Sequence, residues 1–163
     1  MGEDILPQLY DDYSLTVDGA YEYNHVKCKK GDYIIDAGAN SGLYSCYAVA
    51  VGCNVFACDP DSNAIDLLNR QKKICPDNII VIGKGLSNED GSIEFYQSDS
   101  YELSSINMPR GTIKKVKIEI AKLDTLVETG VIPRVDLIKA DVEGAERDLL
   151  TGAVKTLKNM HLN

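Results

Sequence analysis

The sequence has no tryptophan, only two phenylalanines and only two histidines. Neither His25 nor His161 lies in a motif, and no Ser-His-Asp set can be assembled, which disfavours a triad hydrolase. No apolar run approaches the length of a membrane span, and acidic residues stand where a signal peptide carries basic ones. We therefore expect a cytoplasmic protein without a membrane partner.

Basic residues are also scarce. The chain has 17 Lys and Arg against 25 Asp and Glu, which gives a formal net charge of −8 at pH 7. Binding to DNA or RNA depends on neutralising phosphates with basic side chains, so no nucleic-acid partner is expected. The densest basic stretch, Lys114–Lys117, alternates with Val116, Ile118 and Ile120, a pattern that indicates the solvent face of a strand.

The cysteines form no recognisable metal or disulfide pattern. There are five of them, an odd number, with no C-x-x-C pair and no histidine at zinc-like spacing. We expect no metal site and interpret the thiols as small buried apolar groups. The five are Cys28, Cys46, Cys53, Cys58 and Cys75.

A chain of 163 residues, 44% of them hydrophobic, has the size and composition of one folded domain. Residues 1–30 are acidic and rich in tyrosine, and they end at a turn signal, Lys29-Lys-Gly-Asp32. We assign 1–30 as an N-terminal lead-in segment and 31–163 as the domain.

Short apolar runs alternate with helical patterns along this domain. Strands are expected at 33–37, 54–58, 79–82 and 135–139, and helices at 43–51, after Asp59-Pro60, at 124–129 and at the C-terminal end. Ala145, Leu149, Ala153 and Leu157 would line one face of that last helix. The segments 92–96 and 116–120 alternate with period two, which indicates an antiparallel excursion around a polar loop with Ser104 and Ser105. The order predicts an α/β fold with a mainly parallel sheet, helices on both faces, and ligands at the carboxyl ends of the strands.

A glycine-rich turn, Asp36-Ala-Gly-Ala-Asn-Ser-Gly42, joins the first strand to the first helix. Such a turn lets the backbone approach a ligand closely, although a tight turn needs glycine for backbone reasons alone. It is not the dinucleotide fingerprint, because Asn40 and Leu43 stand where that pattern requires glycine.

Asp59 ends the second strand about 20 residues beyond this loop, where an acid can accept hydrogen bonds from a ribose diol. It can also serve as the N-cap of the helix that Pro60 opens, with Asp61 as a first-turn acid.

Three acids follow the fourth strand at the same predicted edge: Asp141, Glu143 and Glu146. Asp141 and Glu143 can orient a substrate hydroxyl, accept its proton or face a cationic ligand. Glu146 serves the site or only caps the helix.

Five ordered motifs resemble the FkbM-type family of S-adenosylmethionine-dependent methyltransferases. They are Gly31–Gly42, Val55–Pro60, Gly85-Leu-Ser87 with Asp90-Gly91, Leu123–Leu126 and Val135–Glu146. The resemblance implies a Rossmann-like methyltransferase domain that binds S-adenosyl-L-methionine and methylates a hydroxyl of a sugar or small metabolite. It also implies cofactor contacts at Asp36, Gly38, Asn40, Gly42 and Asp59, with adenine near Leu86 and Ser87. We also assign Ala39 of the same loop to the cofactor, and we take Asp141 and Glu143 as the catalytic candidates, because methylation of an alcohol needs a base.

Two departures from the family pattern qualify this expectation. Position 59 is Asp where relatives commonly carry Glu, a shorter reach to the ribose. The fold normally continues into a fifth strand and an antiparallel pair, so the terminal strands are expected to be missing and the domain to be truncated after Asn163. A cofactor-binding module without catalysis is therefore one alternative, and a nicotinamide-dependent oxidoreductase is another.

Overall fold

The computed structural model describes residues 26–74, 78–98 and 113–160. Most of the lead-in segment lies outside these ranges, as do His25, Cys75, Ser104, Ser105 and His161.

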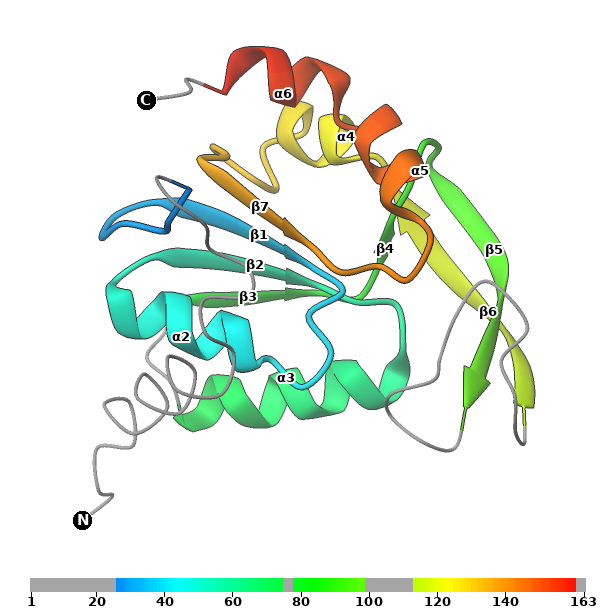
Figure 1. The fold of residues 1–163 in the computed structure, drawn as a ribbon. Coiled ribbons are helices and arrows are strands. Elements are labelled where there is room, and N and C mark those ends of the chain that lie inside the picture. Colours follow the sequence, from blue (N-terminus) through cyan, green and yellow to red (C-terminus); the bar gives the residue numbers. More distant parts are fainter. Residues whose placement is uncertain (1–25, 75–77, 99–112, 161–163) are drawn as a thin grey trace.

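A four-stranded parallel sheet forms the centre of the domain, with strand order β3-β2-β1-β7. Its strands are β1 (Tyr33–Ala37), β2 (Asn54–Cys58), β3 (Ile79–Ile82) and β7 (Leu137–Ala140). All four point their carboxyl ends toward the same side of the molecule (Figure 1). The predicted α/β fold with a mainly parallel sheet is confirmed.

The last strand begins later than the predicted Val135. The Asp136 side chain accepts a hydrogen bond from the Tyr33 N–H at 2.8 Å, and the Asp136 N–H donates to the Tyr33 carbonyl at 2.9 Å. The strand pairing of β1 with β7 then starts at Ile34 and Leu137. A hydrogen bond to a side chain therefore precedes the first paired residues of β1 and β7. The apolar pattern of the sequence did not show this bond.

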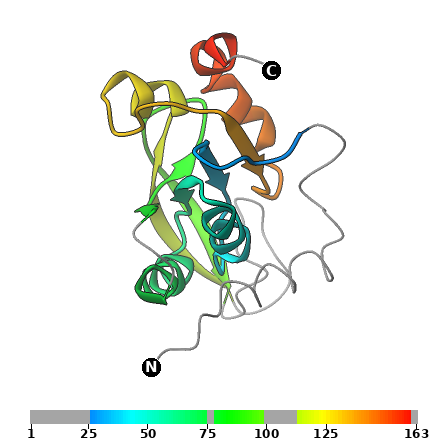
Figure 2. The ribbon, with the colours of Figure 1, turned by 90° about the vertical axis from the view of Figure 1, so that its left-hand side faces the viewer.

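Helices cover both faces of the sheet, as predicted (Figure 1). On one face lie α2 (Leu43–Val51) and α3 (Ser62–Ile74). The other face carries α4 (Leu123–Glu128), α5 (Glu146–Thr151) and α6 (Val154–Asn159). Figure 2, seen nearly along the strands, shows the two groups of helices on opposite sides.

Because the side chains of each strand alternate between the two faces of the sheet, an apolar core forms on each face. Ile34, Val55 and Ile79 pack with α2 and α3, whereas Ile35 and Phe56 pack with α4 and α5. Because both faces of the sheet are covered, its strands read as continuous apolar runs in the sequence. Cys28, Cys46, Cys53 and Cys58 are buried and unbonded to one another, which confirms the interpretation of these four thiols.

The second helix begins at Ser62 and not at Pro60. Asp61 acts as its N-cap, because its Oδ1 accepts the Asn63 N–H at 2.8 Å and its carbonyl accepts the Ile65 N–H at 2.9 Å. The prediction that Asp59 caps this helix was wrong, and Asp59 is thereby left for other contacts.

The predicted last helix is interrupted, so that α5 and α6 replace it. The break lies at Gly152, where a Cβ atom would lie 1.9 Å from the Ser87 carbonyl oxygen. Ala145, Leu149 and Ala153 are buried as expected, but Leu157 is 37% exposed. The close approach to Ser87, which is remote in sequence, explains why helical periodicity alone missed the break.

Asp124 joins α4 to α6. Its Oδ1 accepts hydrogen bonds from the Thr156 N–H and hydroxyl, both at 2.8 Å, and its Oδ2 accepts the Lys155 N–H at 3.0 Å. Burial alone would raise the pKa of Asp124, but these hydrogen bonds outweigh it and lower the pKa below the usual range. The acid therefore stabilises the start of α6 as a carboxylate.

A second sheet holds β4 (Gly85–Leu86), β5 (Gly91–Ser98) and β6 (Ile113–Ala121) in the order β4-β6-β5. Strands β5 and β6 pair antiparallel, as predicted, whereas the short β4 was not predicted and pairs parallel to β6. Lys114, Lys115 and Lys117 are exposed while Ile118 and Ile120 are buried, which confirms the solvent-face interpretation. This sheet stands opposite the carboxyl ends of the central strands (Figure 1).

Candidate active site

A cavity lies between the carboxyl ends of β1, β2 and β7 and the inner face of the second sheet. This is where an open parallel sheet binds its ligands. The lining residues come from the loops after these three strands and from β4, β5, β6 and α3: Gly38, Asn40, Cys58, Asp59, Pro60, Asp61, Ala64, Gly85, Leu86, Ser87, Ile93, Phe95, Ile118, Ile120, Asp141, Val142, Glu143 and Ala145.

The cavity brings together most of the residues that the sequence singled out. Seven of them line it: Gly38, Asn40, Asp59, Leu86, Ser87, Asp141 and Glu143. The other three, Asp36, Ala39 and Gly42, are not part of the lining. The glycine loop therefore meets the ligand space at only two of its positions.

Most backbone N–H groups of the glycine loop donate within the protein. The N–H groups of Gly38 and Ala39 donate to the Cys58 carbonyl at 3.0 and 3.2 Å. The Gly42 N–H donates to the Ala39 carbonyl at 2.8 Å, and the Asn40 N–H donates to Asp59. A loop that binds pyrophosphate presents such groups to the anion. These four donors are already used, so the loop suits a ligand without phosphates.

Gly38 is required by the fold at this edge. Its φ is +71°, and a Cβ atom would lie 2.0 Å from the backbone carbonyl oxygen of Asp141. The sequence had suggested that this glycine makes room for a ligand. The structure gives a different reason, because the missing side chain lets the loops after β1 and β7 touch.

Asp59 connects the end of β2 to the glycine loop. Its Oδ2 accepts the Asn40 N–H and its Oδ1 accepts the Asp61 N–H, both at 2.9 Å. Each carboxylate oxygen has two acceptor positions, so one on each remains for a ligand diol. Burial is the main cause that raises the pKa of Asp59, with the charges of Asp61 and Asp36 adding to it, while the two backbone hydrogen bonds oppose the shift.

Asp36 is a fully buried residue of β1 and is not part of the cavity lining. Its Oδ2 accepts a hydrogen bond from the Ser45 hydroxyl at 2.6 Å, and its Oδ1 lies 3.0 Å from the Lys139 ammonium nitrogen. Lys139 also donates to the Gly38 carbonyl at 2.8 Å. Sequence reasoning assigned no role to Lys139, because a lysine inside a predicted buried strand gives no sign of its partner.

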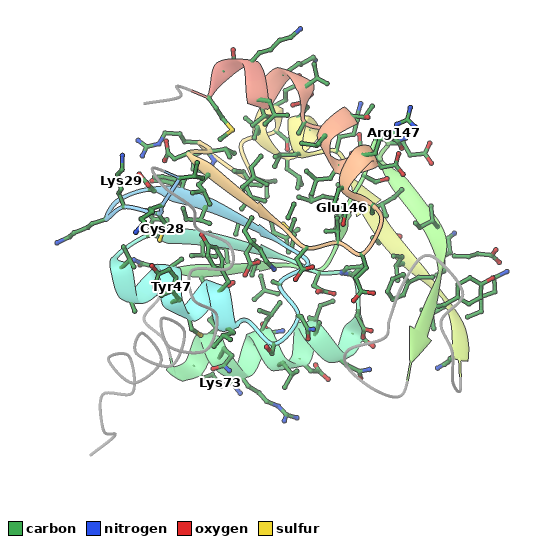
Figure 3. The ribbon with its side chains drawn as sticks, in the orientation of Figure 1. Cys28, Lys29, Tyr47, Lys73, Glu146 and Arg147 are labelled. Carbon is green, nitrogen blue, oxygen red and sulfur yellow. The ribbon has the colours of Figure 1, made fainter. Side chains whose placement is uncertain are left out.

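The loop after β7 presents Asp141 and Glu143 at the cavity, and both are exposed. Glu143 has a φ of +43°, a left-handed conformation that costs a non-glycine residue roughly 1 kcal/mol. Glu146 begins α5 (Figure 3) and accepts the Gly144 N–H at 3.1 Å, so it holds the turn before the helix. The N-cap of α5, Ala145, makes no side-chain cap hydrogen bond, so both roles predicted for Glu146 stay predictions.

The apolar side of the cavity comes from residues that the sequence analysis did not assign to a site. Ile93 and Phe95 of β5 and Ile118 and Ile120 of β6 face it, beside Leu86. The period-two alternation indicated one apolar face on each strand, but it could not indicate what that face contacts. The cavity thus has an apolar wall opposite carboxylates, which suits a ligand with a flat apolar base and a polar or cationic end.

Among the described residues, no group of three or more His, Cys, Asp and Glu side chains is arranged to hold a metal ion. None of the helices in these ranges is long and apolar enough to span a bilayer.

Comparison with known proteins gives two matches. A family model described as the methyltransferase FkbM domain matches residues 36–163. The hexuronic acid methyltransferase AglP of Haloferax volcanii is 29% identical over 135 residues, which are 83% of this chain and 55% of the relative. The chain therefore spans about half the length of that relative. The family match begins in β1 and includes every loop and strand of the cavity, so this chain belongs to the FkbM methyltransferase domain family.

Proposed function

We propose that this protein is an S-adenosylmethionine-dependent O-methyltransferase acting on a hydroxyl of a sugar or small metabolite. The observation that carries the proposal is the cavity in which Asp59 and the glycine loop face Asp141 and Glu143. The family membership and the likeness to a hexuronic acid methyltransferase support it.

The residues present fit this cofactor. The free acceptor positions on Asp59 suit the ribose diol, and Leu86 with Ile120 offers an apolar surface to adenine. Gly38 and Asn40 would lie beside the methionine part. The internally bonded loop does not suit a pyrophosphate, which weighs against the nicotinamide-dependent alternative.

When bound, S-adenosylmethionine supplies a methyl group already activated by the sulfonium. The protein must therefore hold the acceptor hydroxyl in line with that group and exclude water. Asp141 or Glu143 would accept the hydroxyl proton, or orient the hydroxyl, from the loop after β7. The apolar side chains of β5 and β6 would cover the opposite side of the site.

Hexuronic acids and related sugars are the first acceptors to test, because the named relative acts on a hexuronic acid. Calorimetric titration with S-adenosylmethionine, S-adenosylhomocysteine and NAD would test the cofactor. Formation of S-adenosylhomocysteine with a panel of hexuronic acids and neutral sugars, followed by mass spectrometry, would test transfer. Binding of NAD alone would refute the proposal, and binding without turnover on any acceptor would favour the non-catalytic module.

The carboxylates of the loop after β7 can be tested separately. We expect Asp141→Asn and Glu143→Gln to retain most cofactor affinity while turnover falls, by about 10²–10⁴-fold for the residue that acts as the base. Glu146→Gln, which alters the neighbouring turn but no residue of the cavity lining, is the matched control. Unchanged turnover in both variants would remove these acids from the mechanism, and lost binding would assign them to the cofactor.

A further inference from the structure

We propose that Lys139 is a positioning residue that fixes the glycine loop of the cofactor site from a buried position. Asp36 is then the buried counter-ion of this lysine and does not contact the cofactor. The inference rests on the proposed function, and it gives roles to two residues at the ends of β1 and β7.

Two contacts of Lys139 converge on the start of the loop. Its ammonium nitrogen lies 2.8 Å from the Gly38 carbonyl oxygen and 3.0 Å from Asp36 Oδ1. The two side chains are 5% and 0% exposed. Asp36 and Lys139 are partners in the pairing of β1 with β7, so their side chains leave the same face of the sheet.

With the hydrogen bond from Lys139, both the N–H and the carbonyl of Gly38 are bonded within the protein. The Gly38 N–H donates to the Cys58 carbonyl of β2, while the Gly38 carbonyl accepts from Lys139 of β7. The loop is therefore held by the strands on both sides of β1. Asn40 follows two residues later and donates to Asp59, the predicted ribose ligand. A displacement of Gly38 would move Asn40 and Asp59 together.

Asp36 compensates the positive charge of Lys139 in this arrangement. A lysine in this position needs a compensating charge, because a buried ammonium without one is costly. Asp36 supplies that charge and is itself held by the Ser45 hydroxyl of α2. Since Asp36 is fully buried and absent from the cavity lining, its effect on the cofactor passes through Lys139.

Three variants separate the positioning role from the charge pairing: Lys139→Met, Asp36→Asn and the double variant Asp36→Asn/Lys139→Met. Lys139→Met leaves the Asp36 charge without its counter-ion and removes the hydrogen bond to the Gly38 carbonyl. The double variant removes both charges and also lacks the bond to the Gly38 carbonyl. Asp36→Asn keeps the bond between Lys139 and Gly38. Affinity for S-adenosylhomocysteine is measured by calorimetry, and stability by urea unfolding followed by circular dichroism, because the chain has no tryptophan.

We expect Asp36→Asn to lose stability, because Lys139 then lacks its counter-charge, yet to bind within about threefold of wild type once folded. We expect Lys139→Met to lose stability and to bind at least about tenfold more weakly. The double variant should regain much of the stability but remain about tenfold weaker in binding. If the double variant recovered both stability and affinity, Lys139 would serve only as the counter-ion of Asp36. A tenfold loss of affinity in folded Asp36→Asn would return Asp36 to the cofactor. Either result overturns the proposal.

Nuclear magnetic resonance of protein labelled with ¹⁵N-glycine keeps the test independent of ligand binding. The Gly38 and Gly42 signals should shift in the double variant and stay near their wild-type positions in Asp36→Asn. Unchanged Gly38 and Gly42 signals in the double variant would contradict the proposal that Lys139 fixes the loop. If wild-type protein binds neither S-adenosylmethionine nor its product, the proposed function fails while this readout still tests Lys139. If Lys139→Met does not fold, the double variant and Asp36→Asn supply the same comparison.

Discussion

Replacing Asp59 with alanine is the most direct perturbation of the predicted ribose site. The carboxylate accepts one backbone hydrogen bond on each oxygen, from Asn40 and from Asp61, both at 2.9 Å. One acceptor position on each oxygen then remains for the ribose diol. The variant removes both predicted ligand contacts and the hydrogen bond that holds the glycine loop at Asn40.

The expected loss of affinity follows from these contacts. A hydrogen bond to a charged acceptor contributes about 1.5–3 kcal/mol, and the two diol contacts share one carboxylate, so a total near 3 kcal/mol is reasonable. That corresponds to about a 100-fold weaker binding of S-adenosylhomocysteine. Asp59→Asn should also weaken binding, because the side-chain NH2 group replaces one carboxylate oxygen and cannot accept the backbone N–H that this oxygen accepts.

The pH dependence supplies a second test of the same carboxylate. Burial raises the pKa of Asp59, so the group takes up a proton at a higher pH than an ordinary aspartate. Affinity for S-adenosylhomocysteine should fall as the pH falls through this raised pKa, because the protonated acid is a weaker acceptor. Stability should respond in the opposite direction, since a raised pKa in the folded state adds stability at low pH that is lost as the pH rises.

Calorimetry from pH 8 down to about pH 5, with unfolding measured in parallel, would follow both quantities. Asp66→Asn is the matched control, because it removes one negative charge from an exposed position on the adjacent helix α3. Wild-type affinity in a folded Asp59→Ala variant would refute the reasoning and show that the ribose is held elsewhere.

Three further predictions concern other residues of the fold and of the cavity wall. Gly152→Ala should lower the free energy of unfolding by about 1–3 kcal/mol, because its Cβ would meet the Ser87 carbonyl, and a wild-type urea midpoint would contradict this. Asp124→Asn should cost about 2 kcal/mol near neutral pH by weakening the start of α6. Because the pKa of Asp124 is lowered, that difference is present above about pH 4 and should vanish as the pH falls through the folded-state pKa, and a pH-independent difference would exclude the linkage. Burial, with the charges of Asp36 and Asp59, raises the pKa of the Cys58 thiol, so its alkylation at pH 8, followed by peptide mass spectrometry, should be slow and slower still with S-adenosylhomocysteine. Rapid labelling of Cys58 in the folded protein would show that the cavity wall opens.

The five family motifs contain residues that stabilise the fold as well as residues of the candidate site. Asp90, in one of the five motifs, accepts hydrogen bonds from the Lys122 N–H and from the Thr125 hydroxyl, and so joins the start of β5 to α4. Asp124, in the next motif, joins α4 to α6. These acids hold elements together at a distance from the cavity. Residue type and spacing alone do not distinguish them from ligand-binding acids.

The sequence by itself determined the order of the main strands and helices and the edge of the sheet that holds the site, although it missed β4 and the break between α5 and α6. Local patterns were sufficient for this, because apolar runs, glycine turns and period-two alternation reflect short-range geometry. The parallel order then requires the loops after β1, β2 and β7 to meet at one edge, whatever their side chains do. The candidate residues Asp59, Asp141 and Glu143 could therefore be found without coordinates.

Only the tertiary structure decided what each of these residues contacts. The break at Gly152 depends on Ser87, the place of Asp36 depends on Lys139, and the need for Gly38 depends on Asp141. In each case the partner is remote in sequence, so no local pattern could reveal it. The same reason applies to the apolar wall of β5 and β6, since alternation shows that a strand has a buried face but not which ligand space that face closes.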